Sequence, residues 1–132
     1  MFKLSTASRY GLRALVYLAQ NKDCRSAAEI SKNEKIPKAY LEKILVKLNK
    51  AGLVKVSHGA QGGYKLAQTA SKIKIAKALS ALETQKQPTC HFIDGGSCTC
   101  GGSGGCAVKN LEQYLEDEVL QMLNKITLKN LI

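Results

Sequence analysis

The chain has 132 residues and a formal net charge of +10 at pH 7. This length supports one ordinary hydrophobic core with an appendage and excludes two independent domains of typical size. The longest apolar run near the N-terminus, residues 14–19, is too short for a signal peptide or a membrane span. We therefore expect a cytoplasmic protein with no membrane partner.

The positive charge is unevenly distributed along the chain. Residues 1–89 hold 17 basic and 5 acidic side chains, a net of +12, whereas residues 90–132 hold 3 and 5, a net of −2. A basic body beside a near-neutral tail concentrates an electric field that attracts phosphates. Double-stranded DNA is the predicted partner, and the alternative is a lysine-rich surface that serves solubility alone.

Helical periodicity predicts the first two elements. Apolar residues recur at helical spacing over residues 7–21, and Arg9 and Arg13 fall on other faces of this helix. Its basic face is a candidate for phosphate contact. Ser26, followed three residues later by Glu29, is typical of a capping box and predicts a short helix over residues 27–33.

A third helix is predicted over residues 37–51, with Pro37 in its first turn and Gly52 after its end. Its spacing turns one set of residues inward, namely Leu41, Ile44, Leu45 and Leu48, and another outward, namely Ala39, Lys43, Val46 and Lys50. Strands over residues 53–57 and 64–67, joined by a glycine-bearing loop, form a hairpin, and a helix over residues 71–83 closes the core. This order predicts a winged helix-turn-helix, mainly α with a small β-hairpin wing.

The segment 90–106 has a different character. It holds Cys90, Cys98, Cys100 and Cys106 among six of the eleven glycines of the chain. Such a segment cannot build a hydrophobic core of its own, so we expect a ligand or metal to order it. In a reducing compartment, clustered cysteines favour metal or redox chemistry over structural disulfides.

A final helix of about 20 residues is predicted by an apolar stripe, which consists of Val108, Leu111, Leu115, Val119, Met122 or Leu123, and Ile126. Pairing with the same helix of a second subunit buries both stripes at once, so we expect a homodimer; the alternative is a helix that folds back on its own domain. The expected organisation is a DNA-binding domain over residues 1–87, a cysteine-rich segment over residues 88–106, and a dimerisation helix with a tail over residues 107–132.

The candidate DNA contacts lie in two places. The first turns of the third helix, which enter the major groove in a helix-turn-helix, hold Lys38, Ala39, Tyr40, Glu42 and Lys43. Glu42 is a reader that accepts a hydrogen bond from cytosine, the partner of Lys38 in an ion pair, or a solvated side chain. The wing loop offers His58, Gly59, Gly62 and Gly63 for contact with a minor groove or phosphate, although a histidine without any contact fits equally well.

Other classes of protein fit less well. No catalytic triad, pair of carboxylates or phosphate-binding loop has its proper spacing, so an enzyme is not predicted. A basic iron-sulfur carrier needs neither a recognition helix nor a wing. Within the regulator class, a thiol switch without metal, a zinc site and control by a partner protein remain open. His91, beside Cys90, is a candidate substitute ligand, and Cys24 is expected to be a small residue near the start of the second helix.

Several segments resemble the Rrf2 family of winged-helix transcription regulators, which includes iron-sulfur cluster sensors. The resemblance rests on residues 4–10, 36–45, 52–54, 62–64 and 126–131, together with the cysteine segment. It implies a dimer that binds a palindromic promoter site, crossing C-terminal helices and a cluster near the interface. It also implies that Glu42 tunes promoter choice, and it places His58 where the family has a wing arginine.

The cysteine pattern departs from that of the family. The family has three cysteines about six positions apart, a spacing that Cys100 and Cys106 keep and Cys90 does not. One branch of the family adds a histidine where this chain has Lys109, and another adds an acidic residue of the first helix, where none occurs before Asp23. We therefore expect four thiolates, with Cys98 as the fourth ligand, around a cluster for which 2Fe-2S is favoured and 4Fe-4S is possible.

Overall fold

The structure is a computed structural model that describes residues 3–83 and 107–132. Its elements, in chain order, are α1 (Thr6–Gln20), α2 (Ala27–Glu34), α3 (Lys38–Lys50), β1 (Val54–Ser57), β2 (Gly63–Leu66), the 3-10 helix η1 (Ala70–Lys72), α4 (Ile75–Leu82), α5 (Ala107–Lys125) and the 3-10 helix η3 (Leu128–Leu131). The predicted order of helices and hairpin is confirmed.

Serine side chains begin the first two helices. Ser5 Oγ accepts a hydrogen bond from the Ser8 N–H, and Ser26 Oγ accepts one from the Glu29 N–H, each at 3.1 Å. The Glu29 carboxylate, however, pairs with Arg25 at 2.9 Å and accepts from the Tyr17 hydroxyl. Only half of the predicted capping box therefore forms, because Glu29 is engaged by the end of α1 and the loop before α2.

Helix α3 has the two faces that its sequence predicts. The four inward residues are buried, and Ala39, Lys43, Val46 and Lys50 are exposed. Just beyond the helix end, Gly52 has a φ of +73°, a left-handed conformation that favours glycine. The chain then enters the wing within a few residues, so α3 and β1 are held close together.

The wing is a two-stranded antiparallel hairpin that is also tied to the loop before α2. Lys55 pairs with Lys65, and Ser57 pairs with Gly63. The Tyr64 N–H donates to the Arg25 carbonyl at 2.7 Å, and the Arg25 N–H donates to the Tyr64 carbonyl at 2.9 Å. Because both partners are backbone groups, this bridge fixes the base of the wing on the helical body.

The predicted helix over residues 71–83 is wrong at its beginning. Helix α4 starts only at Ile75, and it is preceded by η1 and an extended stretch. The Leu128 N–H donates to the Ile73 carbonyl at 2.9 Å, and the Ile75 N–H donates to the Ile126 carbonyl at 3.0 Å. Backbone groups that a longer helix needs are therefore used to bind the C-terminal tail, in an isolated bridge between Lys74 and Thr127.

The core lies between α1, α3 and α4 and receives one residue from the far end of the chain. Its fully buried side chains include Leu15, Leu45 and Leu82, and Leu128 of η3 is also 0 % exposed. The apolar residues whose spacing predicted this helix, Ile75, Ala78, Leu79 and Leu82, are all buried. The body is thus completed by the tail that follows α5.

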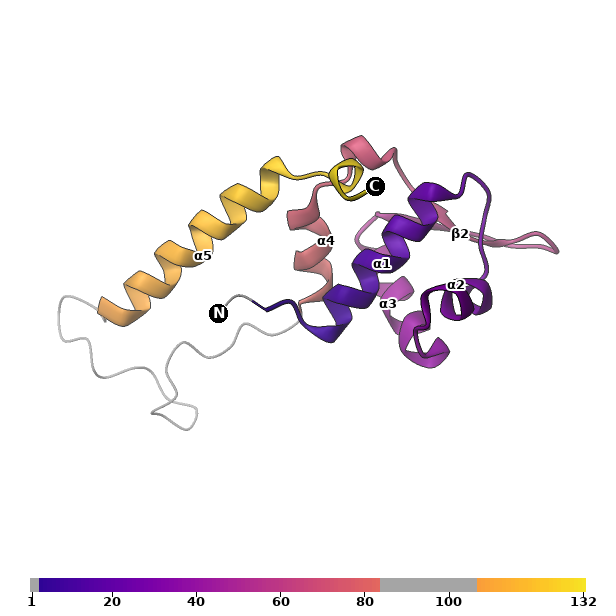
Figure 1. The fold of residues 1–132 in the computed structure, drawn as a ribbon, viewed down its shortest axis with the longest axis horizontal. Coiled ribbons are helices and arrows are strands. Elements are labelled where there is room, and N and C mark those ends of the chain that lie inside the picture. The colour runs from indigo at the N-terminus through magenta and orange to yellow at the C-terminus, as the bar shows by residue number, and fades with distance from the viewer. Residues whose placement is uncertain (1–2, 84–106) are drawn as a thin grey trace.

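Helix α5 lies at one side of this body, opposite the wing (Figure 1). None of its 19 residues is buried. Its predicted apolar stripe is largely open to solvent in the single chain, with Val108 63 % and Leu115 52 % exposed. Only its last turns, at Leu123 and the following Ile126, pack against the core. No helix in the part of the chain that the structure describes is long and apolar enough to cross a membrane.

Candidate nucleic-acid interface

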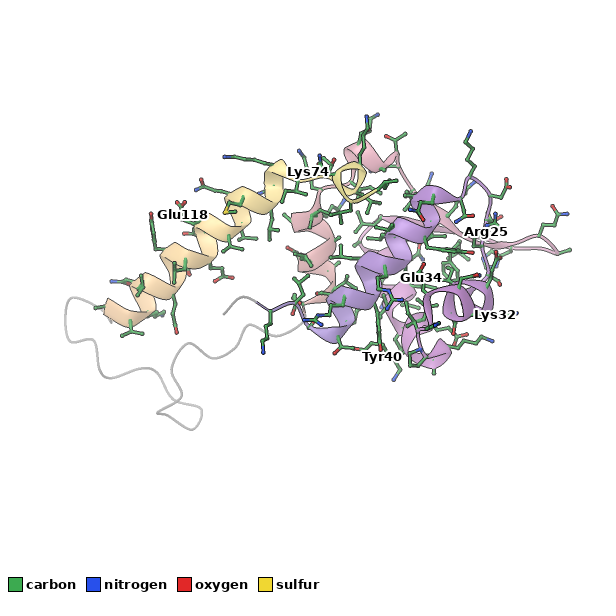
Figure 2. The ribbon with its side chains drawn as sticks, viewed as in Figure 1. Arg25, Lys32, Glu34, Tyr40, Lys74 and Glu118 are labelled. Atoms are coloured by element: carbon green, nitrogen blue, oxygen red, sulfur yellow. The ribbon has the colours of Figure 1, made fainter. Side chains whose placement is uncertain are left out.

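The outward face of α3 is accessible over its whole length. All five residues of its first turns that were predicted to meet DNA are exposed, namely Lys38, Ala39, Tyr40, Glu42 and Lys43, and Leu41 between them is buried as predicted. Tyr40 lies at the edge of the body (Figure 2). The face carries Lys38, Lys43 and Lys50 against a single acid, Glu42, so its net charge is positive and attracts anions.

Glu42 does not pair with Lys38. Among residues 3–83 and 107–132, the ion pairs within 4.0 Å are Arg13 with Glu34 and Arg25 with Glu29. The alternative that the sequence left open, an intrahelical ion pair, is therefore not formed. The Glu42 carboxylate is exposed and open to a donor from outside the chain.

The wing loop gives its glycines different roles. His58 is exposed, and Gly59 has a φ of +117° with open space around it. At Gly63, a Cβ atom would lie 2.5 Å from the Arg25 carbonyl oxygen, and at Gly62 it would lie 2.3 Å from the Ser57 carbonyl oxygen. Close packing inside the chain thus accounts for Gly62 and Gly63, whereas Gly59 and His58 face outward.

Helix α1 also reaches the beginning of α3. Arg9 is exposed on α1, and the adjacent Tyr10 ring meets the Tyr40 ring edge to face, with centroids 5.7 Å apart and planes at 79°. Sequence reasoning included Arg9 and Tyr40 but missed Tyr10. No local pattern links the two tyrosines, since they lie 30 positions apart.

Arg13, predicted to lie on the basic face of α1, has a partner inside the chain. Its Nε lies 3.2 Å from Glu34 Oε2, and its Nη2 donates to the Glu34 carbonyl at the end of α2. Nearby, burial raises the pKa of Tyr17, and the hydrogen bond that it donates to Glu29 raises it further. These contacts hold α2 on α1 and so support the turn that leads into α3.

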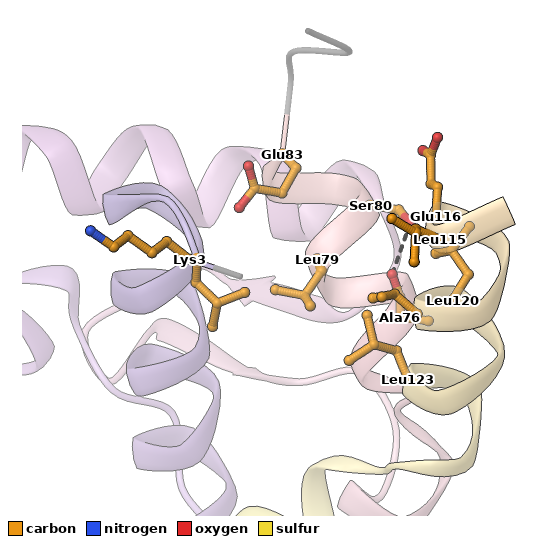
Figure 3. A pocket seen from close by; sticks show the side chains of 11 residues that line it. Lys3, Ala76, Leu79, Ser80, Glu83, Leu115, Glu116, Leu120 and Leu123 are labelled. Atoms are coloured by element: carbon orange, nitrogen blue, oxygen red, sulfur yellow. Dashed lines mark hydrogen bonds between the residues drawn. The ribbon is translucent and has the colours of Figure 1, made fainter. Parts of the chain in front are cut away.

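A second feature lies away from α3, between α4, the N-terminal segment and α5. It is an open groove of about 570 Å³ whose α5 wall includes Leu115, Val119 and Leu123. Figure 3 shows Leu79 of α4 between the two walls, with Lys3 and Glu83 on the side of the body. The groove is mainly apolar in its lining, which is unusual for surface that remains in water.

Glu83, at the rim of this groove, connects α4 to α1. Its Oε1 accepts from Ser8 Oγ at 2.5 Å and from the Ser5 N–H at 3.2 Å. The hydrogen bond from Ser8 lowers the pKa of Glu83; partial burial opposes this, and the bonds from Ser5 add to it. Sequence analysis assigned Glu83 no role beyond the end of a helix.

The predicted cluster ligands Cys90, Cys98, Cys100 and Cys106 lie outside the described residues, as do His91 and Asp94, which stands six positions before Cys100 where the family spacing has a cysteine. Cys24, by contrast, is a free and partly buried thiol in the loop before α2. Within residues 3–83 and 107–132, no three His, Cys, Asp or Glu side chains are grouped as a metal site needs.

Comparison with known proteins places this arrangement in a family. Residues 4–132 match the Rrf2 family, described as iron-dependent transcriptional regulators. The HTH-type transcriptional regulator IscR of Cereibacter sphaeroides is 38% identical over 117 residues, which are 86% of this chain and 73% of that protein.

Two solved structures are similar over nearly the whole chain. The IscR of T. potens matches with a TM-score of 0.74 and 29% identity, covering 98% of this chain and 85% of that one. CymR, the global cysteine regulator of B. subtilis, matches with a TM-score of 0.74 and 29% identity, covering 99% and 96%. These relatives are regulators of transcription rather than enzymes. The chain is therefore a winged-helix transcription regulator and belongs to the Rrf2 family.

Proposed function

We propose that the chain is a homodimeric regulator that reads duplex DNA with α3 and the wing and senses iron-sulfur or redox status through its cysteine segment. The observation that carries this proposal is the exposed, mostly basic face of α3. Helix α3 ends at Lys50, and the first strand of the wing begins shortly after it, at Val54. A recognition helix needs such a face to enter a major groove, while cations and backbone amides fix its register on phosphates.

Within this interface we assign different roles to different residues. Lys38 and Lys43 supply affinity that does not depend on sequence, because they neutralise phosphates. Glu42 supplies discrimination, because an open carboxylate accepts from cytosine N4 but repels phosphate. We assign contacts with the DNA backbone or minor groove to His58 and Gly59 at the wing tip and to Arg9 on α1, because all three are exposed.

The homodimer is supported by the exposed stripe of α5 and the apolar groove beside it. A second copy is the economical occupant, since an isologous contact covers the stripes of both chains at once. Leu115 and Val119 line the groove and belong to the stripe, so one interface accounts for both features. The palindromic symmetry expected of the promoter site follows from the two-fold symmetry of such a dimer.

For the sensor we propose Cys90, Cys100 and Cys106 as ligands, with Cys98 as the fourth. Four thiolates are the donor set that 2Fe-2S and 4Fe-4S clusters require, and the cluster, when bound, supplies a group that responds to iron and oxidants. Helix α5 begins at Ala107, the residue after Cys106. The last ligand is thus joined directly to the helix that we place in the dimer interface.

The DNA assignment is tested by titrating a duplex of random sequence and a duplex selected from a randomised library at two salt concentrations. We expect affinity for both to fall steeply with salt. Glu42→Ala should reduce preference at one or two base pairs by about 1 to 3 kcal/mol while non-specific affinity stays or rises. Asp117→Ala, on α5, is the matched control. An affinity for DNA that does not change with salt concentration would favour an iron-sulfur carrier protein instead.

The cluster assignment is tested on anaerobically purified protein by its absorption spectrum and by counts of iron and sulfide. Cys→Ala changes at 90, 100 and 106 should each abolish the cluster absorption, and Cys24→Ala should leave it intact. A normal spectrum for Cys98→Ala would move the fourth ligand to His91, Asp94 or an external group. Reconstituted protein that stays colourless while binding zinc, or while forming a reversible disulfide, would contradict the cluster.

A second candidate has the same fold without a cluster. The observation that favours it is the match to CymR, a cysteine regulator, which reaches the same TM-score of 0.74 as the match to IscR. In that case a thiol switch or a partner protein sets DNA affinity. The spectrum and the metal counts described above separate the two candidates.

A further inference from the structure

The beginning of α1 is held by a buried hydroxyl. Ser8 is 0 % exposed and is the one buried polar side chain in the part of the chain that the structure describes. A buried hydroxyl is costly unless it is hydrogen-bonded, and Ser8 Oγ donates to Glu83 Oε1 at 2.5 Å. The Ser5 N–H, at the cap of the same helix, donates to the same oxygen at 3.2 Å. One carboxylate therefore fixes the first turn of α1.

The same turn of α1 contacts the proposed recognition helix on its other side. Tyr10 follows Ser8 by two residues, which is a rotation of roughly 200° around a helix, so the two side chains lie on nearly opposite faces. Tyr10 meets Tyr40 edge to face, and Tyr40 is 38% exposed in the first turn of α3. Helix α1 thus stands between Glu83 and the beginning of α3.

Glu83 also occupies a particular place in the chain. It is the residue after the end of α4, and the sequence continues from it into the segment that holds the four clustered cysteines. Its contacts to Ser8 and Ser5 join that point to α1 across more than seventy residues of sequence. No other hydrogen bond of the described side chains joins the end of α4 to the beginning of α1.

We propose that Glu83 is a positioning residue for DNA recognition: it holds the first turn of α1 through Ser8 and Ser5, and α1 in turn sets Tyr40 and the start of α3 through Tyr10. The inference rests on the proposed function, since it assumes that the start of α3 reads bases. It goes beyond that function by assigning base discrimination to a side chain that does not touch DNA and that lies five positions before the cysteine-rich segment 88–106.

The test uses the full chain and the duplex that the wild-type protein selects from a randomised library. Glu83→Gln keeps the size of the side chain and weakens the acceptor, and Ser8→Ala removes the donor. Each should lower the ratio of affinities for the selected and the random duplex by about 2- to 30-fold. Because Ser8 is buried, circular dichroism is used to check that the Ser8→Ala variant is folded. Glu83 is exposed, so Glu83→Gln still tests the inference if Ser8→Ala does not fold.

A matched control removes the same charge elsewhere. Asp117→Asn, on the face of α5 away from the stripe, should leave the ratio unchanged, and sedimentation should show the same assembly for every variant. In addition, the ring proton shifts of Tyr40, measured by NMR without DNA, should change in Glu83→Gln and not in Asp117→Asn. If Glu83 only stabilised the fold, without positioning Tyr40, the ring proton shifts of Tyr40 would not change in Glu83→Gln.

A double-mutant cycle with Tyr10→Leu completes the test. If the effect passes through Tyr10, adding Glu83→Gln to Tyr10→Leu should change the affinity ratio no further. Additive effects, or wild-type Tyr40 shifts in Glu83→Gln, would overturn the inference while leaving the proposed function intact. A wild-type protein that selects no duplex at all would overturn both.

Discussion

Helices α4 and α5 make opposite use of similar apolar residues. Helix α4 buries five residues in a length of eight, whereas α5 buries none in a length of 19. The difference lies in what each helix faces: α4 packs on α1 and α3, and most of α5 faces solvent and an open groove. Apolar content alone does not make a core, because a second surface must be available to cover it.

The contrast between α4 and α5 separates two contributions to stability, one from packing within a chain and one from contact with another molecule. The body closes its core with residues of one chain, so its free energy of unfolding should not depend on protein concentration. We infer that a second copy of the chain covers the stripe of α5, so the contribution of the stripe to stability should follow mass action. The four predictions below test that division, beginning with the largest expected effect.

The first prediction concerns the core of the body. Leu45→Ala, at a fully buried position of α3, should lower the free energy of unfolding by about 2 to 5 kcal/mol, because it leaves a cavity among well-packed side chains. Urea unfolding at two protein concentrations measures this cost. Val46→Ala, one residue further on and 48% exposed, is the control and should cost less than about 0.5 kcal/mol.

The second prediction concerns α5. Leu115→Asp combined with Val119→Asp should raise the dimer dissociation constant about 100-fold or more, because charges enter an apolar interface. Sedimentation measures assembly, and circular dichroism should show that the body stays folded. Asn110→Asp with Asn124→Asp places the same charges on the opposite face and should not change assembly. If the variant with both Leu115→Asp and Val119→Asp remained a tight dimer, the stripe of α5 would not be the dimer interface, and the contrast drawn above between α4 and α5 would fail.

The third prediction concerns the base of the wing. Gly63→Ala should destabilise the protein by about 1 to 3 kcal/mol, because the added Cβ meets the Arg25 carbonyl and the backbone has a φ of +153°. Amide exchange at Tyr64 should report the weakened bridge. Gly59→Ala, in open space at the tip of the same wing, should leave that exchange unchanged.

The smallest effect is expected at the contact between α1 and α4. Because hydrogen bonds hold the pKa of Glu83 below its ordinary value, the ionised carboxylate stabilises the fold at neutral pH. This contribution is lost as the pH falls through the ordinary glutamate range to the lowered pKa. Glu83→Gln should therefore be less stable than wild type at neutral pH, with a difference that shrinks in acid. A difference that grows in acid would contradict the assignment.

Much of the fold could be predicted because local patterns determine it. The two faces of α3 follow from residue spacing, and the ends of α1 and α2 follow from capping serines and turn residues. The failures come from contacts between distant segments. The late start of α4 depends on backbone bonds to residues 126 and 128, and the Tyr10 and Glu83 contacts join residues far apart in sequence. Periodicity carries no information about such pairs.

The return of the chain at Leu128 has a consequence for how new variants of this protein can arise. The chain leaves the body after Glu83 and is fastened again where residues 126–128 bond to Ile73 and Ile75. Residues 84–125, which include α5, lie between these two points. Since the entropic cost of a closed loop rises by only about 0.6 kcal/mol for each doubling of its length, changing the number of residues between Glu83 and α5 should cost the body little free energy. We therefore expect the body to accept another sensor sequence between Glu83 and Ala107 while α5 is kept for dimerisation, which is a direct route to a regulator with a new input.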